Sequence, residues 1–185
     1  MVVPSVCGAS AYAACVVQHV RLTVGPATPA DFGRIAELTA GVYRDEGYGN
    51  ETYLAQLADV AGRAEHADLL VARDPAAVDG TSDVVGSVAL VLEGEFGEVL
   101  HSAAEAGFRM LVVDRAARGR GIGELLVSAC LDRARAAGKR RMVLSTEPGM
   151  RTAHRLYERL GFTRLPERDW SPMPGIRLLV YAREI

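Results

Sequence analysis

The chain has 185 residues, of which 49% are hydrophobic, and its formal net charge is −2 at neutral pH. This length and hydrophobic content predict one folded domain with a sizeable core and argue against general disorder. A charge balance so close to zero gives the whole chain no electrostatic reason to bind nucleic acid or an anionic membrane surface. No apolar run reaches the roughly 18 residues that a membrane-spanning helix needs. We therefore expect no nucleic-acid partner and no membrane partner, and any anion site must be local.

Residues 1–18 are small and apolar, but they do not have the pattern of a secretory signal peptide. They lack a basic start, and Pro4 and Gly8 interrupt the hydrophobic stretch. We expect a disordered or mis-assigned tail over residues 1–18 and one domain over residues 19–185, with secretion as the alternative. The cysteines are odd in number and have no metal-like spacing, which predicts reduced thiols, a cytoplasmic location and no metal site. They are Cys7, Cys15 and Cys130.

Hydrophobic periodicity and turn residues divide the rest of the chain into strands and helices. Thr28 followed by Asp31 is typical of a helix start, and Gly138 is typical of a helix end. Residues 93–107 and 166–175 have no clean period and are expected to be connections. The expected elements are strand 20–24, helix 28–40, a helix from 50 to about 61, strands 68–72, 84–92 and 108–114, helix 121–138, strand 141–145, helix 150–160, and strands 162–165 and 176–183.

The order of these elements predicts the fold class. Three consecutive strands, 68–72, 84–92 and 108–114, favour antiparallel neighbours. The next strand, 141–145, follows a helix, so it needs a parallel crossover connection. We expect an α/β (α+β) domain with a mixed, mostly antiparallel central sheet and helices on both faces.

A basic, glycine-rich turn, Arg115-Ala-Ala-Arg-Gly-Arg-Gly-Ile-Gly123, lies between a strand and a helix. Glycines let the backbone approach a ligand closely, and the free N–H groups and positive dipole end of the helix favour an anion. The turn has neither the Gly-Lys-Ser/Thr of a Walker loop nor the Gly-x-Gly-x-x-Gly of a dinucleotide site. It predicts a phosphate-binding turn. An ordinary tight connection and a contact with nucleic-acid phosphate are the alternatives.

Two segments resemble the signatures of the GCN5-related N-acetyltransferase (GNAT) family. Arg118, Gly121 and Gly123 match its Arg/Gln-x-x-Gly-x-Gly/Ala signature. Ala153-His-Arg-Leu-Tyr-Glu-Arg-Leu-Gly-Phe162, one strand and part of a helix downstream, is similar to its Ala-x-x-Leu-Tyr-x-x-x-Gly-Phe segment. The order of the expected elements is also that of the family, so the resemblance covers residues 20–183.

The resemblance implies that acetyl-CoA binds at the turn as a co-substrate. Its pyrophosphate would lie on the backbone amides of residues 118–123, and its pantetheine arm would pair with the strand at 111–113. The family's two central parallel strands splay apart and leave that strand edge free. Here they would be the strand ending at Val113 and the one starting near Arg141. The implied cofactor-binding residues are Leu111, Val112, Val113, Arg118, Gly119, Arg120, Gly121, Ile122 and Gly123.

The resemblance also implies that Tyr157 is the catalytic residue. The matching tyrosine of the family protonates the thiolate that leaves, which suits a phenol of pKa about 10 beside a thiol of pKa about 8.5. Acetyl transfer is expected to run directly to a primary amine of a small molecule or peptide in a ternary complex, so Cys130 is expected to pack and not to react. A non-catalytic acyl-CoA-binding regulatory module is the alternative. A homodimer is one assembly that we consider for this chain.

The sequence leaves the proton acceptor for the amine unassigned. Glu105, His101 and Glu46 are candidates, although each also fits a solvated surface group. Met150 stands where the family often has an asparagine that helps to bind the cofactor, which leaves that role to backbone groups near Thr146 or to none. An acceptor pocket is expected at aromatic residues in loops, which include the only tryptophan. They are Tyr43, Tyr48 and Trp170.

Overall fold

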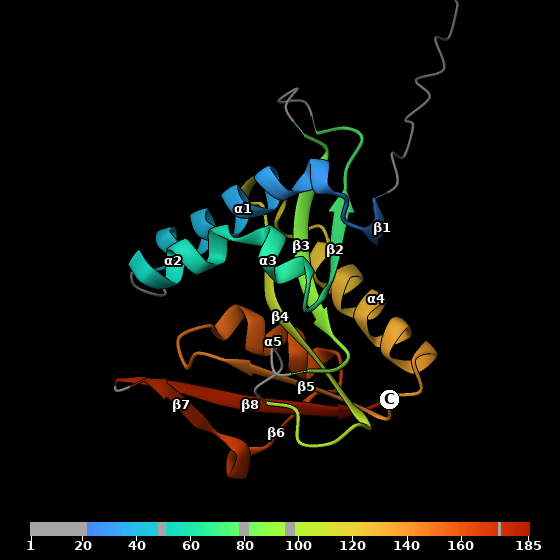
Figure 1. Ribbon diagram of the computed structural model, residues 1–185, viewed down its shortest axis with the longest axis vertical. Helices are drawn as coiled ribbons and strands as arrows, with labels where there is room; N and C mark the ends of the chain where they lie inside the picture. Colours follow the sequence, from blue (N-terminus) through green and yellow to red (C-terminus); the bar gives the residue numbers. More distant parts are fainter. Residues whose placement is uncertain (1–21, 48–50, 78–81, 95–98, 174) are drawn as a thin grey trace, which may run out of the picture.

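The computed structural model describes residues 22–47, 51–77, 82–94, 99–173 and 175–185 (Figure 1). The expected tail over residues 1–18 lies outside the described residues. The elements are β1 (Thr23–Pro26), the 3-10 turn η1 (Pro29–Asp31), α1 (Phe32–Asp45), α2 (Glu51–Ala58), α3 (Val60–Ala64), β2 (Asp68–Arg73), β3 (Val84–Val91), β4 (Glu105–Val113), η2 (Arg115–Ala117), α4 (Ile122–Ala136), β5 (Arg141–Thr146), α5 (Arg151–Arg159), β6 (Thr163–Arg164), η3 (Pro166–Arg168), β7 (Trp170–Met173) and β8 (Ile176–Glu184).

The strands pair in the order β1-β2-β3-β4-β5-β8-β6, and β7 adds to β8. Among the described residues, every pairing is antiparallel except that of β4 with β5. The helices α1 and α3 cover one face of the β2–β4 half of the sheet, α2 lies beside α1, and α4 covers the other face (Figure 1). The predicted mixed, mostly antiparallel sheet with helices on both faces is confirmed.

The hydrophobic core lies on both faces of the central strands. All residues of β3 are buried, because helices cover it on both sides. On one face, α4 and α5 pack through residues such as Leu126 and Tyr157. On the other face, α1 and α3 pack through residues such as Ile35 and Val60. Helices α1 and α5 therefore lie on opposite faces of the sheet.

The two parallel strands, β4 and β5, pair only over their first residues. The pairs are Glu105 with Arg141, Ala106 with Met142, and Gly107 with Val143. The last pair favours glycine, since a Cβ on Gly107 would lie only 3.1 Å from the carbonyl oxygen of Val143. Beyond it, in the described part of the chain, β4 pairs with β3 and β5 pairs with β8. The two strands therefore part and leave an opening between their C-terminal halves.

A bulge in β4 lies beside this opening. The register with β3 shifts between Ser87 and Ala89, and Met110 has a φ of 53°. A positive φ is uncommon for a residue with a large side chain, and such strained residues cluster at functional sites. Because a bulge bends its strand, it helps β4 to turn away from β5.

Several elements differ from the sequence-based expectation, and three of the differences have a clear physical reason. The strand β4 starts at Glu105 instead of residue 108, because pairing with β5 and a buried ion pair hold a segment that has no apolar pattern. The strand β7 lies inside the expected loop 166–175, where it pairs with β8. The expected second helix is two helices, since the Asp59 carboxylate accepts the N–H of Gly62 and starts α3.

Candidate active site

The phosphate-binding turn predicted from the sequence connects β4 to α4. At its start, the N–H of Asp114 donates to the carbonyl of Val85 at 2.8 Å. The Asp114 carboxylate accepts from the N–H of Ala116 at 2.9 Å and from Arg34 at 2.5 Å. These contacts fix the direction of the chain as it leaves β4 and enters η2.

Two glycines shape the end of the turn. Gly119 and Gly121 have φ values of 80° and 78°, which L side chains rarely adopt. Gly121 is the N-cap of α4, and a Cβ there would meet open space. The N–H of Leu125 donates to the carbonyl of Gly121, so the N–H groups of residues 122–124 are left for an anion. Together these groups form a backbone cradle, the place where the sequence predicts that a phosphate binds.

The arginines of the turn are held by carboxylates in this structure. Arg118 Nη2 lies 2.8 Å from Glu46 Oε1, and Arg120 Nη1 lies 2.5 Å from Asp74 Oδ2. The hydrogen bond from Arg120 keeps the pKa of Asp74 below its usual value. An anion at the turn would therefore meet free backbone N–H groups. To bind it as well, Arg118 or Arg120 would have to leave its carboxylate partner.

The strand edge predicted to hold the pantetheine arm faces the opening. Val112 and Val113 pair with β3 on one side, whereas the pairing with β5 on the other side ends at Gly107. The side chain of Val112 packs under α1, and those of Leu111 and Val113 pack on the face that carries α4. An extended chain with amide groups can add to such an edge as a further strand.

Tyr157 lies on α5 at this opening and is 6% exposed. Its ring centre is 5.8 Å from that of Phe108, the first residue of β4 beyond the parallel pairing. It is also 6.2 Å from the ring centre of Tyr181 on β8. Burial raises the pKa of Tyr157 above its ordinary value, so the hydroxyl stays protonated at neutral pH. A neutral, buried phenol in this position can donate a proton.

Tyr43 reaches the same opening from the other face of the sheet. Helix α1 runs past its expected end and carries Tyr43, whose ring centre lies 5.9 Å from that of Tyr53 on α2. Burial raises the pKa of Tyr43, the phenols of Tyr53 and Tyr157 raise it further, and Arg109 of β4 opposes the rise. Tyr157 acts electrostatically on Tyr43 although α1 and α5 lie on opposite faces of the sheet, and β4 and β5 stop pairing between these two faces.

The three proton acceptors considered from the sequence all belong to the framework around the opening. Glu105 and His101 lie at the paired end of β4, where Arg168 binds both Glu105 carboxylate oxygens at 2.7 and 3.0 Å. Burial would raise the pKa of Glu105, but the hydrogen bonds from Arg168 and the His101 N–H outweigh it and hold the pKa below its usual value. Glu46 forms the ion pair with Arg118.

Glu147 is an acidic residue at the opening that the sequence did not single out. It directly follows β5, at the end of the strand that diverges from β4. Burial raises its pKa, and its charge acts on Tyr43. Within the described ranges, its carboxylate has no ion-pair partner. In the sequence, the one indication of its role was its position shortly after strand 141–145, which was expected to be the parallel partner of strand 108–114.

The loop that carries Glu147 is tied to the start of α5. Thr146 Oγ1 donates to Met150 Sδ at 3.4 Å, and His154 Nε2 lies 3.1 Å from the carbonyl oxygen of Glu147. Met150 thus contacts Thr146, the residue whose neighbourhood was expected to take over from the missing asparagine.

Other residues expected near the site are placed differently. Tyr48 lies outside the described residues. Trp170 lies on β7 and packs with Val99 and Val143 on the β5–β8 half of the sheet. Cys130 is fully buried in α4, and burial raises the pKa of its thiol to about 12, which fits a packing role.

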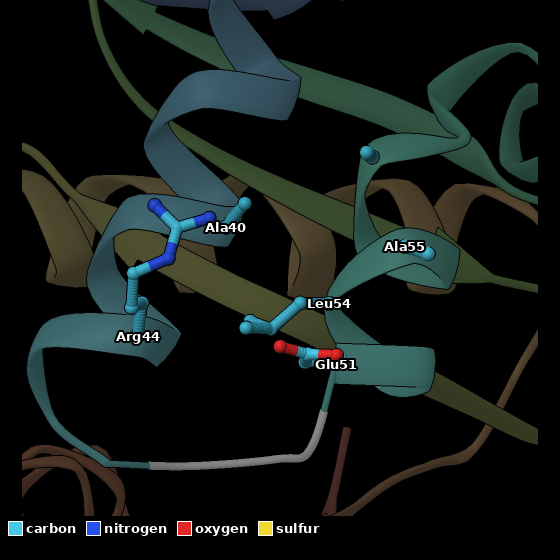
Figure 2. A pocket seen from close by; sticks show the side chains of 6 residues that line it. Ala40, Arg44, Glu51, Leu54 and Ala55 are labelled. Carbon is cyan, nitrogen blue, oxygen red and sulfur yellow. The ribbon is translucent and has the colours of Figure 1, made fainter.

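A pocket between α1 and α2 contains none of the residues predicted from the sequence. Figure 2 shows the side chains of Arg44, Leu54 and Glu51 extending into the space between the two helices. Its lining is mostly apolar, and its two charged residues are Arg44 and Glu51. The residues are Ala40, Arg44, Glu51, Leu54, Ala55 and Ala58.

A mixed sheet whose two parallel strands part beside a glycine-rich turn is the arrangement that the resemblance to the N-acetyltransferases implies. The sequence pattern of the acetyltransferase (GNAT) family matches residues 34–162. A protein of Oryza sativa subsp. japonica named "Probable glucosamine 6-phosphate N-acetyltransferase 2" is 32% identical over 179 residues, which cover 96% of this chain and 95% of that protein.

Solved structures agree with the sequence comparison. A GCN5-related N-acetyltransferase from Kribbella flavida has a TM-score of 0.64 and 26% identity, covering 89% of this chain and 98% of that chain. The protein yncA from Salmonella typhimurium, solved with its cofactor acetyl-CoA, has a TM-score of 0.58 and 22% identity over 88% of this chain and 93% of that chain. The chain belongs to the acetyltransferase (GNAT) family and is an acetyl-CoA-dependent N-acetyltransferase. The family and the enzyme class predicted from the motifs are confirmed.

Among the residues that the structure describes, no helix is long and apolar enough to cross a membrane. In the same ranges, no group of His, Cys, Asp and Glu side chains could hold a metal ion.

Proposed function

We propose that this enzyme transfers the acetyl group of acetyl-CoA directly to a primary amine of a small molecule or peptide in a ternary complex. The observation that carries the proposal is the opening between β4 and β5, with the backbone cradle beside it and Tyr43 and Tyr157 on its walls. Both substrates can meet there without an acyl-enzyme. Cys130, the free cysteine of the described residues, is buried in α4 and supports this route.

The backbone of the site fits acetyl-CoA in two places. The N–H groups of residues 118–123 would bind the pyrophosphate. The edge of β4 at residues 111–113 would pair with the pantetheine arm. A chain that leaves the cradle along this edge reaches the bulge at Met110, so the thioester would lie between Tyr157 and Tyr43.

Glu147 and Tyr157 have the properties that the proton transfers require. An amine attacks the thioester carbonyl in its neutral form, and Glu147, whose pKa is raised by burial, would accept its proton directly or through a water molecule. As the carbon–sulfur bond breaks, Tyr157 would give its proton to the sulfur. The products are an amide and CoA with a free thiol; Glu147 returns its proton to solvent and Tyr157 recovers one from solvent.

Two classes of amine are candidates for the acceptor of the acetyl group. The rice relative is named for glucosamine 6-phosphate, which supports a small amine as the first class to test. A peptide amino terminus is the second class. We place the enzyme in the cytoplasm, since a buried free thiol fits a reducing compartment.

Two measurements test the proposal in sequence. Isothermal titration of acetyl-CoA into the purified protein should show binding, and the absence of heat at high micromolar ligand would contradict it. Thiol release from acetyl-CoA in the presence of an amine library should then exceed the rate without amine. Binding without amine-dependent thiol release would favour the regulatory module over the enzyme.

A further inference from the structure

We infer that His154 is a positioning residue for the proposed reaction, because its ring holds the loop of Glu147 on α5, the helix that carries Tyr157. The inference rests on the proposed function, in which Glu147 accepts the proton of the amine and Tyr157 protonates the sulfur. His154 itself exchanges no proton with either substrate. It sets the position of the proton acceptor relative to the proton donor.

The loop that carries Glu147 extends beyond the sheet. Strand β5 ends at Thr146, which pairs with Leu179 of β8, so Glu147 is the first residue after the strand. Pro148 and Gly149 are exposed, and α5 starts two residues later. Because sheet pairing no longer holds the backbone here, the position of the loop depends on the hydrogen bonds that anchor it.

His154 provides such an anchor. Its Nε2 lies 3.1 Å from the carbonyl oxygen of Glu147 and 3.4 Å from Thr146 Oγ1. A carbonyl oxygen can only accept, so Nε2 must carry the proton of this hydrogen bond. The hydroxyl of Thr146 donates to Met150 Sδ, so its oxygen can accept from the same N–H. Both the neutral ring with a proton on Nε2 and the imidazolium can therefore hold the loop.

The ring of His154 also contacts the aromatic residues that surround Tyr157. Its centre lies 5.5 Å from that of Tyr181, with 34° between the two planes. The ring of Tyr181 in turn lies 6.2 Å from that of Tyr157. His154 and Tyr157 are three residues apart on α5 and so lie on neighbouring positions of the helix surface. One side chain thus contacts the backbone of the proposed proton acceptor and the aromatic support of the proposed proton donor.

These contacts predict how the loss of His154 would affect the reaction. General acid–base catalysis needs groups within hydrogen-bond reach, and a misplacement of about 1 Å can lower the rate by about 100-fold. Without the Nε2 donor, the Glu147 loop would be free to move away from α5. The cradle lies on another loop, between β4 and α4, and would keep its place. We therefore expect kcat to fall while the affinity for acetyl-CoA stays the same.

Two substitutions separate the donor from the ring. His154→Phe keeps an aromatic ring beside Tyr181 but has no donor for the carbonyl of Glu147. His154→Gln has no ring but keeps an N–H donor of similar reach. Arg155→Gln serves as the control, since Arg155 is exposed on the same helix and bonds to Thr152.

The first experiment is the thiol-release assay at saturating amine and acetyl-CoA. His154→Phe should have a kcat about 10- to 100-fold below that of the wild type, with a Kd for acetyl-CoA within about 3-fold by calorimetry. His154→Gln and Arg155→Gln should both keep kcat within about 3-fold. A wild-type kcat in His154→Phe, or an equal loss in both variants of His154, overturns the inference.

The second experiment asks whether His154 acts through Glu147. In a Glu147→Gln background, His154→Phe should lower kcat by less than about a further 3-fold, because residues that act as a unit are not additive. A full further loss overturns the inference. If Glu147→Gln alone keeps the wild-type kcat, the proton acceptor of the proposed function is wrong and the inference falls with it, so the two failures are told apart.

A third measurement needs neither turnover nor a folded His154→Phe protein. In ¹⁵N NMR spectra of the wild type, Nε2 of His154 should carry a proton throughout the range from about pH 5 to about pH 9. The His154→Gln spectrum identifies the resonance. A ring that has its proton on Nδ1 and none on Nε2 overturns the inference, since it cannot donate to the carbonyl of Glu147.

Discussion

Tyr43 on α1 and Tyr157 on α5 lie on opposite faces of the sheet, and ionisation of Tyr157 would nevertheless raise the pKa of Tyr43. A continuous sheet would separate the two phenols. Between the two phenols, β4 and β5 stop pairing after Gly107 and Val143. In the proposed reaction, the thioester would lie in this opening between Tyr157 and Tyr43.

Tyr157→Phe should lower kcat by about 100- to 1000-fold, because the thiolate then leaves without its proton donor. The Kd for acetyl-CoA, measured by calorimetry, should change by less than about 3-fold, since the phenol does not belong to the cradle or the strand edge. A large loss of acetyl-CoA affinity would show that Tyr157 binds the cofactor and does not transfer a proton.

The raised pKa of Tyr157 also leads to a prediction for kcat at alkaline pH. The protonated phenol is the active form, and burial raises its pKa above the ordinary value of 10.0. Activity that depends on this proton is lost as the pH rises through the raised pKa. The wild type should therefore show no decline in kcat between pH 8 and about pH 9.5. A decline within this interval, absent in Tyr157→Phe, would contradict the pKa direction.

Gly121→Val should weaken acetyl-CoA binding by at least about 10-fold, which calorimetry measures directly. The valine strains a residue with a φ of 78°, and its side chain fills the open space in front of the α4 N–H groups. Gly175→Val is the matched control, because Gly175 has a φ of 87° and open space around it but lies at the turn between β7 and β8. Equal acetyl-CoA affinity in the two variants would refute the cradle.

Glu147→Gln should lower kcat by about 100-fold or more if its carboxylate accepts the amine proton. The carboxylate must be ionised, so the wild-type activity should fall as the pH drops through a value above 4.5, and this ionisation should disappear from the profile of the variant. Glu37→Gln, at an exposed position on α1, should leave the profile unchanged.

Stability separates a catalytic from a structural role for Glu147. A raised pKa means that the folded state prefers the protonated acid, so the ionised carboxylate reduces stability at neutral pH. The Tm of Glu147→Gln at neutral pH should therefore equal or exceed that of the wild type. A lower Tm together with lower activity would mean that Glu147 supports the fold instead.

Glu105→Gln should lower the free energy of unfolding at neutral pH by about 3 kcal/mol, since it leaves the buried Arg168 guanidinium without its charge partner. The pKa of Glu105 is held below its ordinary value of 4.5, so this stability is present above 4.5 and is lost as the pH falls through the lower, folded-state pKa. In denaturant unfolding, the difference between the free energies of unfolding of wild type and variant should therefore shrink as the pH falls. Glu167→Gln, exposed on η3, is the control and should show no such gap.

The sequence by itself determined the parts of the protein that local patterns encode. The apolar run before Asp114, the glycines of the turn and the stripe of α4 specify strand, turn and helix in that order, and their signatures identified the family. Backbone cradles can be predicted in this way because their groups are close in the chain and their geometry follows from glycine and helix termini.

Only the tertiary structure decided which side chains lie around the opening. Tyr43, Arg109 and Glu147 are separated by long stretches of sequence, yet Arg109 and Glu147 both act electrostatically on Tyr43. Whether a carboxylate binds an arginine, as Glu105 does, or stands at the opening without an ion-pair partner in the described residues, as Glu147 does, depends on those long-range contacts. Burial and neighbouring charge set each pKa, and neither is encoded in a local pattern.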